Sequence, residues 1–179
     1  MDYFTSDHHF SHKNILGFAG RPWDNTHDMN KQLIENWNSV VGNKDRVFYL
    51  GDFSFASVQS TKSILERLNG EILFVPGNHD KRGILEIIPN VLPLIYEYRV
   101  PTNQKNIIVL CHYPMVEWNR SFTGSLHLHG HCHGRGENGR NRFDVGIDNV
   151  AKFLPDGTMN PKNYRPVSLK EILEINGWQ

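Results

Sequence analysis

The sequence predicts an α/β fold whose first part is a largely parallel sheet. Short apolar runs alternate along the chain with stretches that have the apolar spacing of a helix, and this alternation is typical of parallel strands joined by helices. The apolar runs are residues 3–5, 47–50 and 71–75. Farther along, the runs 94–100 and 106–110 flank a turn at 101–104, which predicts a hairpin. We therefore expect more antiparallel pairing in the later part of the fold.

Apolar periodicity and capping residues predict the helices. The strongest stripe covers residues 29–41, with Thr26 or Asp28 as the N-terminal cap. Ser57 is expected to begin a second helix, and residues 84–88 a short third one. These helices connect the predicted strands, so their stripes are expected to pack on the sheet.

The last third of the chain is less regular. Residues 143–147 read as another strand, and residues 148–166 carry Pro, Gly and Asn at intervals, so we expect them to wrap the surface. Ser168 and Glu171 form a capping box that predicts a final helix through Ile175.

Length and composition indicate one globular domain over residues 1–179. The chain has 179 residues, and 39% of them are hydrophobic, which is enough for one sizeable core. Lys and Arg together number 19, as do Asp and Glu. This balance gives no overall basic field, so we do not expect tight binding to long nucleic acids.

The cysteine content and the N-terminal residues predict a cytoplasmic location. Cys111 and Cys132 are the two cysteines, too few for a disulfide framework, and we interpret both as packing residues. The chain begins without a basic segment followed by an apolar run, and it has no stretch of membrane-spanning length.

Histidines and carboxylates gather where the predicted strands end. The chain has ten histidines, and histidine is the commonest metal ligand among side chains. Because the carboxyl ends of parallel strands meet at one edge, side chains that follow them can converge on a ligand. The stretches concerned are Asp7-His8-His9, Gly51-Asp52, Gly77-Asn78-His79-Asp80, His112 and Gly130-His131-Cys132-His133.

Each stretch also has a plain structural interpretation. Pro76-Gly77-Asn78 is ordinary turn chemistry, and Ser11 could cap a short helix through Leu16. For any one stretch taken alone, the structural interpretation is at least as good as a metal site. Five such stretches in one order favour the metal site.

The ordered set of stretches resembles the calcineurin-like metallophosphoesterase superfamily. The resemblance extends from residue 7 to residue 133, and the stretch 6–22 is similar to small stand-alone members from bacteria and phages. It implies two facing mixed β-sheets flanked by helices, a four-layer αββα sandwich, with two metal ions at one edge.

The resemblance also implies a role for each matching residue. One ion would be held by Asp7, His9 and His133, the other by Asn78, His112 and His131, and Asp52 would bridge the two. His79 would face the substrate as a catalytic residue, and Asp80 would orient it. The ligands are nitrogen and oxygen without thiolate, which suits Mn²⁺, our favoured ion, and also Fe or Zn²⁺.

The implied activity is a metal-dependent hydrolysis of phosphoric esters. A hydroxide that bridges the two ions would attack phosphorus, and a histidine could protonate the leaving group. Protein phosphatases of the superfamily carry an Arg soon after G-D and read G-N-H-E, whereas this chain has Phe53-Ser54-Phe55 and Asp80. We therefore expect a phosphodiesterase that acts on a small diester, such as a cyclic or short nucleotide.

Three alternatives remain open. They are a phosphomonoesterase with the same site, a protein-binding scaffold that has lost catalysis, and a structural zinc module built from His112, His131, Cys132 and His133. His8, His12, His127 and His129 have no assigned role. The glycine-rich loop 134–142 and the arginines Arg82, Arg120, Arg135 and Arg142 are candidates for phosphate contact, and a solvated loop is an equally good interpretation.

Overall fold

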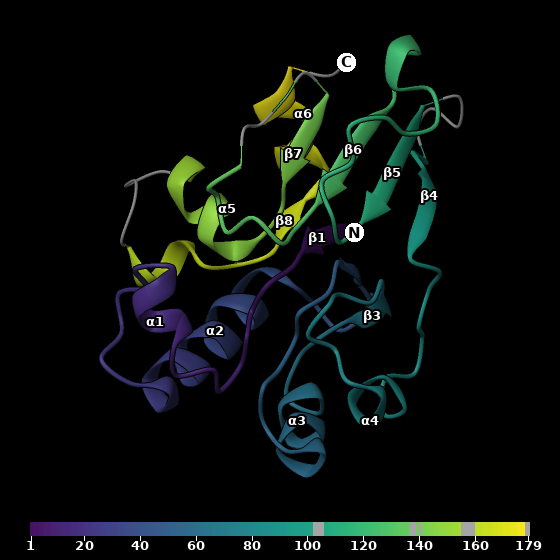
Figure 1. Ribbon diagram of the computed structural model, residues 1–179. Coiled ribbons are helices and arrows are strands. Elements are labelled where there is room, and N and C mark those ends of the chain that lie inside the picture. The colour runs from purple at the N-terminus through teal and green to yellow at the C-terminus, as the bar shows by residue number, and fades with distance from the viewer. Residues whose placement is uncertain (102–105, 137–138, 140, 155–159, 178–179) are drawn as a thin grey trace.

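The computed structural model describes residues 1–101, 106–136, 139, 141–154 and 160–177. Within these residues the protein has two four-stranded sheets and six α-helices (Figure 1). Both sheets contain parallel and antiparallel pairs. The predicted α/β class with mixed sheets is therefore confirmed.

The first sheet is built from the N-terminal half of the chain and one late strand. Its order is β3-β2-β1-β8, with β1 at Asp2–Thr5, β2 at Arg46–Tyr49, β3 at Glu71–Phe74 and β8 at Val167–Ser168. The first three strands are parallel, as predicted, and β8 is antiparallel to β1. Strands β1, β2 and β3 therefore all end at the same edge of this sheet.

The second sheet has the order β4-β5-β6-β7. Its strands are β4 at Ile95–Arg99, β5 at Ile107–Cys111, β6 at Leu126–His129 and β7 at Arg142–Asp144. The predicted hairpin is confirmed as the antiparallel pair β4–β5, while β5, β6 and β7 are parallel. Most of the turn between β4 and β5 lies outside the described residues.

Two apolar clusters form the core. One joins side chains of both sheets, including Phe4 and Phe48 of the first and Leu110 and Leu128 of the second. The other joins the first sheet to the helices, where Trp37 of α2 is fully buried. Helix α2 (Thr26–Val40) and helix α3 (Val58–Leu65) connect the parallel strands and lie on the side of the first sheet away from the second (Figure 1).

The helix ends partly confirm the predicted caps. The side chain of Ser57 caps α3, and Ser168 and Glu171 form the capping box of α6 (Leu169–Asn176), as predicted. Helix α2 is capped by Asn25, whose side chain accepts a hydrogen bond from the Asp28 backbone, and not by Thr26 or Asp28. Asn25 precedes Thr26 in extended backbone, which is the geometry that a cap requires.

Three segments differ from the prediction. Helix α4 covers Arg82–Leu85 and so begins before the predicted start. Helix α1 (Ile15–Phe18) does not begin at Ser11, which has a positive φ of 64°. The strand predicted over residues 143–147 ends at Asp144, and Ile147–Phe153 form helix α5, whose first turn is buried, although residues 148–166 were expected to wrap the surface. The apolar residues of α5 pack into both core clusters, so packing overrides the weak local pattern.

Candidate metal centre

The loops that follow β1, β2, β3, β5 and β6 meet where the parallel strands of the two sheets end. Gly130 donates a backbone hydrogen bond to His112, and Asp7 donates one to Gly51. Phe10 and Ser54 form an isolated parallel bridge that ties the loops after β1 and β2 together. These contacts bring the polar residues of five separate stretches to one place.

Five of the seven predicted ligands have left-handed backbone. They are Asp7, His9, Asp52, His131 and His133, with φ between 50° and 70°. Non-glycine residues adopt this conformation at a cost of about 1–3 kcal/mol each, and such residues cluster at functional sites. At these residues the backbone is therefore not extended as in a strand, although the side chains converge.

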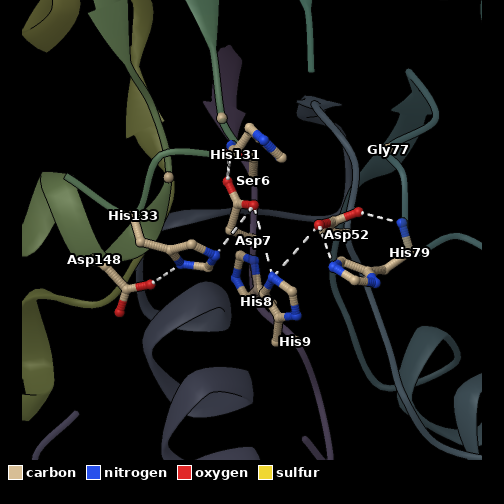
Figure 2. A network of polar contacts seen from close by, with 12 residues as sticks. Ser6, Asp7, His8, His9, Asp52, Gly77, His79, His131, His133 and Asp148 are labelled. Carbon is tan, nitrogen blue, oxygen red and sulfur yellow. Dashed lines mark hydrogen bonds and ion pairs between the residues drawn. The ribbon is translucent and has the colours of Figure 1, made fainter. Parts of the chain in front are cut away.

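Asp7, His9 and His133 form a first cluster, which we call the inner group. Their ligand atoms lie within 4.8 Å of one another. His9 Nε2 is 3.7 Å and His133 Nε2 is 3.9 Å from Asp7 Oδ1. Figure 2 shows Asp7 between the two imidazole rings. Asp7 Oδ1 and His9 Nε2 are buried and have no hydrogen-bond partner, which is costly for polar atoms unless a ligand satisfies them.

The buried ion pair Arg21–Asp148 anchors the inner group. Asp148 Oδ2 lies 2.7 Å from His133 Nδ1, and Asp148 accepts two hydrogen bonds from Arg21, at 2.8 and 2.9 Å. Arg21 also donates to the backbone carbonyls of Asp7 and His8. Since a carboxylate can only accept, His133 Nδ1 carries a proton, and Nε2 is the ring nitrogen that faces the inner group.

Arg21 and Asp148 were not predicted as site residues. Arg21 precedes the predicted helix 29–41, and Asp148 fell in the segment expected to wrap the surface. The useful signal was a charged residue of each sign in otherwise apolar surroundings, but 127 positions separate them, so no spacing rule connects them.

Asp52, His112 and His131 form a second cluster, which we call the outer group, and Asn78 joins it. The ligand atoms of the first three lie within 4.8 Å of one another. Asn78 Oδ1 is 2.9 Å from His112 Nε2 and 3.0 Å from His131 Nδ1. His112 Nδ1 lies 2.7 Å from the carbonyl oxygen of Leu50, which only accepts. His112 Nε2 therefore presents a lone pair to the amide oxygen, an arrangement of acceptors that suits a cation.

Asp52 belongs to the outer group and also faces the inner group. Its Oδ2 is 3.6 Å from His9 Nε2 of the inner group and 3.5 Å from His112 Nε2 of the outer group. Its Oδ1 accepts a hydrogen bond of 2.8 Å from the backbone N–H of His79. One carboxylate oxygen thus faces both groups, while the other fixes the orientation of the side chain.

Two glycines allow the loops to approach this closely. A Cβ at Gly51, where φ is 83°, would lie 2.7 Å from His112 Nδ1. A Cβ at Gly130 would collide with Ser6 Oγ and Asp7 Oδ2. The G-D and G-H-x-H patterns therefore require glycine because no side chain fits at these positions.

His79 and Asp80 differ in what they contact. The His79 side chain is 48% exposed, and its Nε2 is 4.0 Å from Asp52 Oδ2 (Figure 2). Asp80 accepts hydrogen bonds from the backbone N–H groups of Asp52, Phe53 and Gly77, at 2.7 to 2.9 Å. The expectation that Asp80 orients the His79 ring is therefore wrong, because both carboxylate oxygens hold the backbone of the G-D and G-N loops.

The electrostatics of the inner group keep Asp7 ionised. Burial alone would raise the pKa of Asp7, but contact with His9 and the charges of His112 and His133 hold it well below its usual range. Burial also works against protonation of His133, yet the hydrogen bond to Asp148 and the charge of Asp7 raise its pKa above the ordinary value. An ionised buried carboxylate among imidazoles is typical of a cation site.

The remaining histidines divide by their contacts. His8 is fully buried, and its Nδ1 lies 3.1 Å from the Tyr49 hydroxyl. His127 Nδ1 and His129 Nδ1 lie 2.9 and 2.8 Å from backbone carbonyls. These three pack in the interior, whereas His12 is partly exposed and stacks on Phe55.

The arginines suggested for phosphate contact are spread over the molecule. Arg82 pairs with Glu86 in an exposed salt bridge, and Arg142 donates to the Met115 carbonyl. Arg135 is exposed. Part of the loop 134–142 lies outside the described residues, so its proposed phosphate contact stays a prediction.

The donor set fits divalent cations. Each group offers imidazole nitrogens and a carboxylate oxygen, and the buried atoms Asp7 Oδ1 and His9 Nε2 lack any other partner. Nitrogen and oxygen donors of this kind suit Mn²⁺, Fe and Zn²⁺. The zinc-module alternative would use Cys132, which belongs to neither group.

The fold and the site define an α/β protein with two adjoining clusters of potential metal ligands, and known proteins share its sequence and fold. The uncharacterized protein MJ1445 of Methanocaldococcus jannaschii is 36% identical over 176 residues, which is 97% of this chain and 89% of that protein. The chain therefore belongs to the same family as that protein. The Gene 66 protein of Mycobacterium phage L5 is 26% identical over 73% of this chain and 76% of its own length.

A solved structure shares the fold. The crystal structure of AQ665, a protein of unknown function from Aquifex aeolicus, matches with a TM-score of 0.70 and 21% identity over 98% of both chains. This likeness shows the fold alone. No protein-family model matches the chain. In the part of the chain that the structure describes, no helix has both the length and the apolarity needed to cross a membrane.

Proposed function

We propose that this protein is a dinuclear metal-dependent phosphoesterase, and most specifically a cytoplasmic phosphodiesterase that hydrolyses a small diester. In this proposal it is a member of the calcineurin-like metallophosphoesterase superfamily, and its two sheets with their helices form the four-layer αββα sandwich. The observation that carries the proposal is the position of Asp52, whose Oδ2 faces His9 Nε2 and His112 Nε2 at 3.6 and 3.5 Å.

The inner and outer groups would each hold one divalent cation, with Mn²⁺ favoured. Two such cations would supply positive charge to the phosphoryl oxygens and would lower the pKa of an attacking water molecule. Asp52 would serve both groups. The left-handed backbone of Asp52 and the hydrogen bond from the His79 backbone fix the position of the Asp52 carboxylate.

His79 would act on the leaving group. Its ring is about half exposed and lies beside Asp52 at the open side of the site. A histidine in this position can donate a hydrogen bond or a proton to the departing oxygen. Asp80 would contribute indirectly, because it holds the backbone from which Asp52 and His79 project.

The test is hydrolysis of bis(p-nitrophenyl) phosphate and of p-nitrophenyl phosphate by chelator-treated protein, with and without added Mn²⁺. We expect cleavage of the diester that depends on the metal and exceeds cleavage of the monoester. The variant His79→Ala should lose roughly 100-fold or more of the diester activity, whereas His27→Ala, which removes an exposed histidine of α2, should not.

Metal content is read on the same samples. Wild type and His79→Ala should both hold two Mn²⁺ per chain by elemental analysis, because His79 is not a proposed ligand. Preference for the monoester would replace the proposal with a phosphomonoesterase. Two bound ions without turnover of either ester would contradict catalysis on simple esters and favour a binding role.

A further inference from the structure

Large aromatic side chains flank the candidate ligands on both sides. Phe55 is 39% exposed, and its ring centroid lies 5.3 Å from that of His9 and 5.0 Å from that of His79. Tyr113 is 44% exposed and lies 5.0 Å from His131. Exposed aromatic rings beside buried ionised groups are a typical feature of ligand sites.

Phe55 is held more firmly than an exposed side chain usually is. Its backbone N–H donates to the Phe10 carbonyl at 2.9 Å, next to the bridge between Phe10 and Ser54. Its ring stacks on His12, with 3.9 Å between centroids and 10° between planes. The His12 ring therefore packs against one face of the Phe55 ring, and the exposed part of Phe55 is fixed in place before any ligand binds.

Tyr113 is oriented differently. Its ring stands edge-on to His112 and His131, with interplanar angles of 77° and 61°. No ring lies flat against it among the residues that the structure describes. Of the two aromatic side chains, Phe55 is thus the one presented as a flat and supported surface.

We infer that Phe55, backed by His12, is a stacking surface for a planar ring in the substrate, so that the substrate class is a phosphoester carrying a nucleobase or a similar aromatic group. This inference rests on the proposed phosphoesterase function. Because His79 lies against Phe55, we assign the planar ring of the substrate to its leaving group, which departs on the His79 side. Stacking of a base on an aromatic side chain strengthens binding by roughly 5- to 150-fold.

The test compares two probes that share a phosphate and a ribose but differ in the base. Adenosine 5′-monophosphate and ribose 5-phosphate are titrated by calorimetry into the full chain loaded with Mn²⁺. We expect wild type to bind the nucleotide roughly tenfold more tightly. Phe55→Leu should reduce this ratio to below about twofold by weakening nucleotide binding while leaving ribose 5-phosphate binding unchanged. Phe55→Trp, which keeps a stacking face, should retain the ratio.

Matched variants locate the effect. Phe122→Leu removes a phenylalanine that is 86% exposed in the 3-10 turn Ser121–Thr123, and it should keep the wild-type ratio. Loss of the ratio in Tyr113→Leu but not in Phe55→Leu would overturn the assignment to Phe55. Mn²⁺ stoichiometry measured on each variant checks that the site is intact.

The outcomes separate this inference from the proposed function. Equal affinity of wild type for the two probes, with metal-dependent diester hydrolysis retained, would overturn the stacking surface and leave the phosphoesterase standing. Absence of binding by either probe in the presence of Mn²⁺, together with absence of hydrolysis, would overturn the proposed function and this inference with it.

Discussion

The inner and outer groups have similar donors, but their surroundings differ. The inner group is buried, and its least buried member, His133, has a side chain that is 19% exposed and touches Asp148 at 2.7 Å. In the outer group His131 is exposed, and its ring contacts the Asn78 amide oxygen and Tyr113. The inner group is anchored to a buried ion pair, whereas the outer group includes one exposed residue, His131.

This difference indicates how each group is held without metal. The pair Arg21–Asp148 fixes His133 and the Asp7 backbone in place, so the inner geometry belongs to the fold. In the outer group, the His131 ring contacts the Asn78 amide oxygen, which also contacts His112, and the His131 backbone N–H donates to Asp7; no ion pair fixes the His131 ring in the part of the chain that the structure describes. We therefore expect the inner group to bind its ion more tightly and the outer group to exchange its ion more readily.

The largest expected effect comes from breaking the buried pair. Arg21→Met should lower the free energy of unfolding of the metal-free protein by about 3–5 kcal/mol, because the buried Asp148 carboxylate loses its guanidinium partner and both hydrogen bonds from it. Urea unfolding measures this. The matched control is Arg46→Met, since Arg46 binds Asp2 with the same two-pronged geometry but is 46% exposed. Equal losses in the two variants would show that burial does not distinguish the pairs.

A second variant tests whether the anchor supports metal binding. Asp148→Asn keeps an oxygen that can accept from His133 Nδ1 but removes the charge. We expect the affinity of one of two Mn²⁺ sites to fall roughly 10- to 100-fold, as measured by calorimetry on chelator-treated protein. Asp24→Asn, at an exposed position, should change neither site. Unchanged binding in Asp148→Asn would contradict the anchoring role.

A substitution in the outer group should change the free energy of unfolding by less. His131→Ala removes an exposed side chain, so the stability of the metal-free protein should change by about 0.5 kcal/mol or less. The Mn²⁺ content should nevertheless fall from two ions per chain to one. Loss of both ions would show that the two groups bind cooperatively rather than as separate sites.

The smallest expected effect is the pH dependence of the stability that the Arg46–Asp2 pair contributes. Burial alone would raise the pKa of Asp2, but the hydrogen bonds from Arg46 and Tyr98 hold it below the ordinary value of 3.8. A lowered folded-state pKa stabilises the protein above the ordinary value, and this contribution is lost as the pH falls through the folded-state pKa. The difference in unfolding free energy between wild type and Arg46→Met, about 1 kcal/mol or less, should therefore be fully present above pH 3.8 and should decline as the pH falls from 3.8 through the lower folded-state pKa. A difference that does not decline over this range would contradict a charge effect.

The convergence of the candidate ligands could be predicted because of chain topology. Parallel strands that alternate with helices must end at one edge, so Asp7, Asp52 and Asn78 were expected to converge, and the structure places them in two adjoining groups. The local geometry was not predictable in this way. Asp7 and Asp52 have left-handed backbone, and only contacts with other loops hold such a conformation against its cost.

Asp80 shows the same limit. A carboxylate next to a histidine in sequence suggests that the two side chains interact, yet Asp80 accepts hydrogen bonds from Asp52, Phe53 and Gly77. Two of these donors belong to a different stretch of the chain. Adjacent residues in a turn point in different directions, so sequence proximity says little about side-chain contact.

What could be learned from the order of residues is the class of fold and the chemistry of the ligand set, because apolar periodicity and residue type are local properties. The pairing of Arg21 with Asp148, the burial of α5 and the stacking of His12 on Phe55 depend on segments far apart in the chain. Such contacts form when two sheets and their helices pack together, since packing selects among many possible partners that no local pattern can rank.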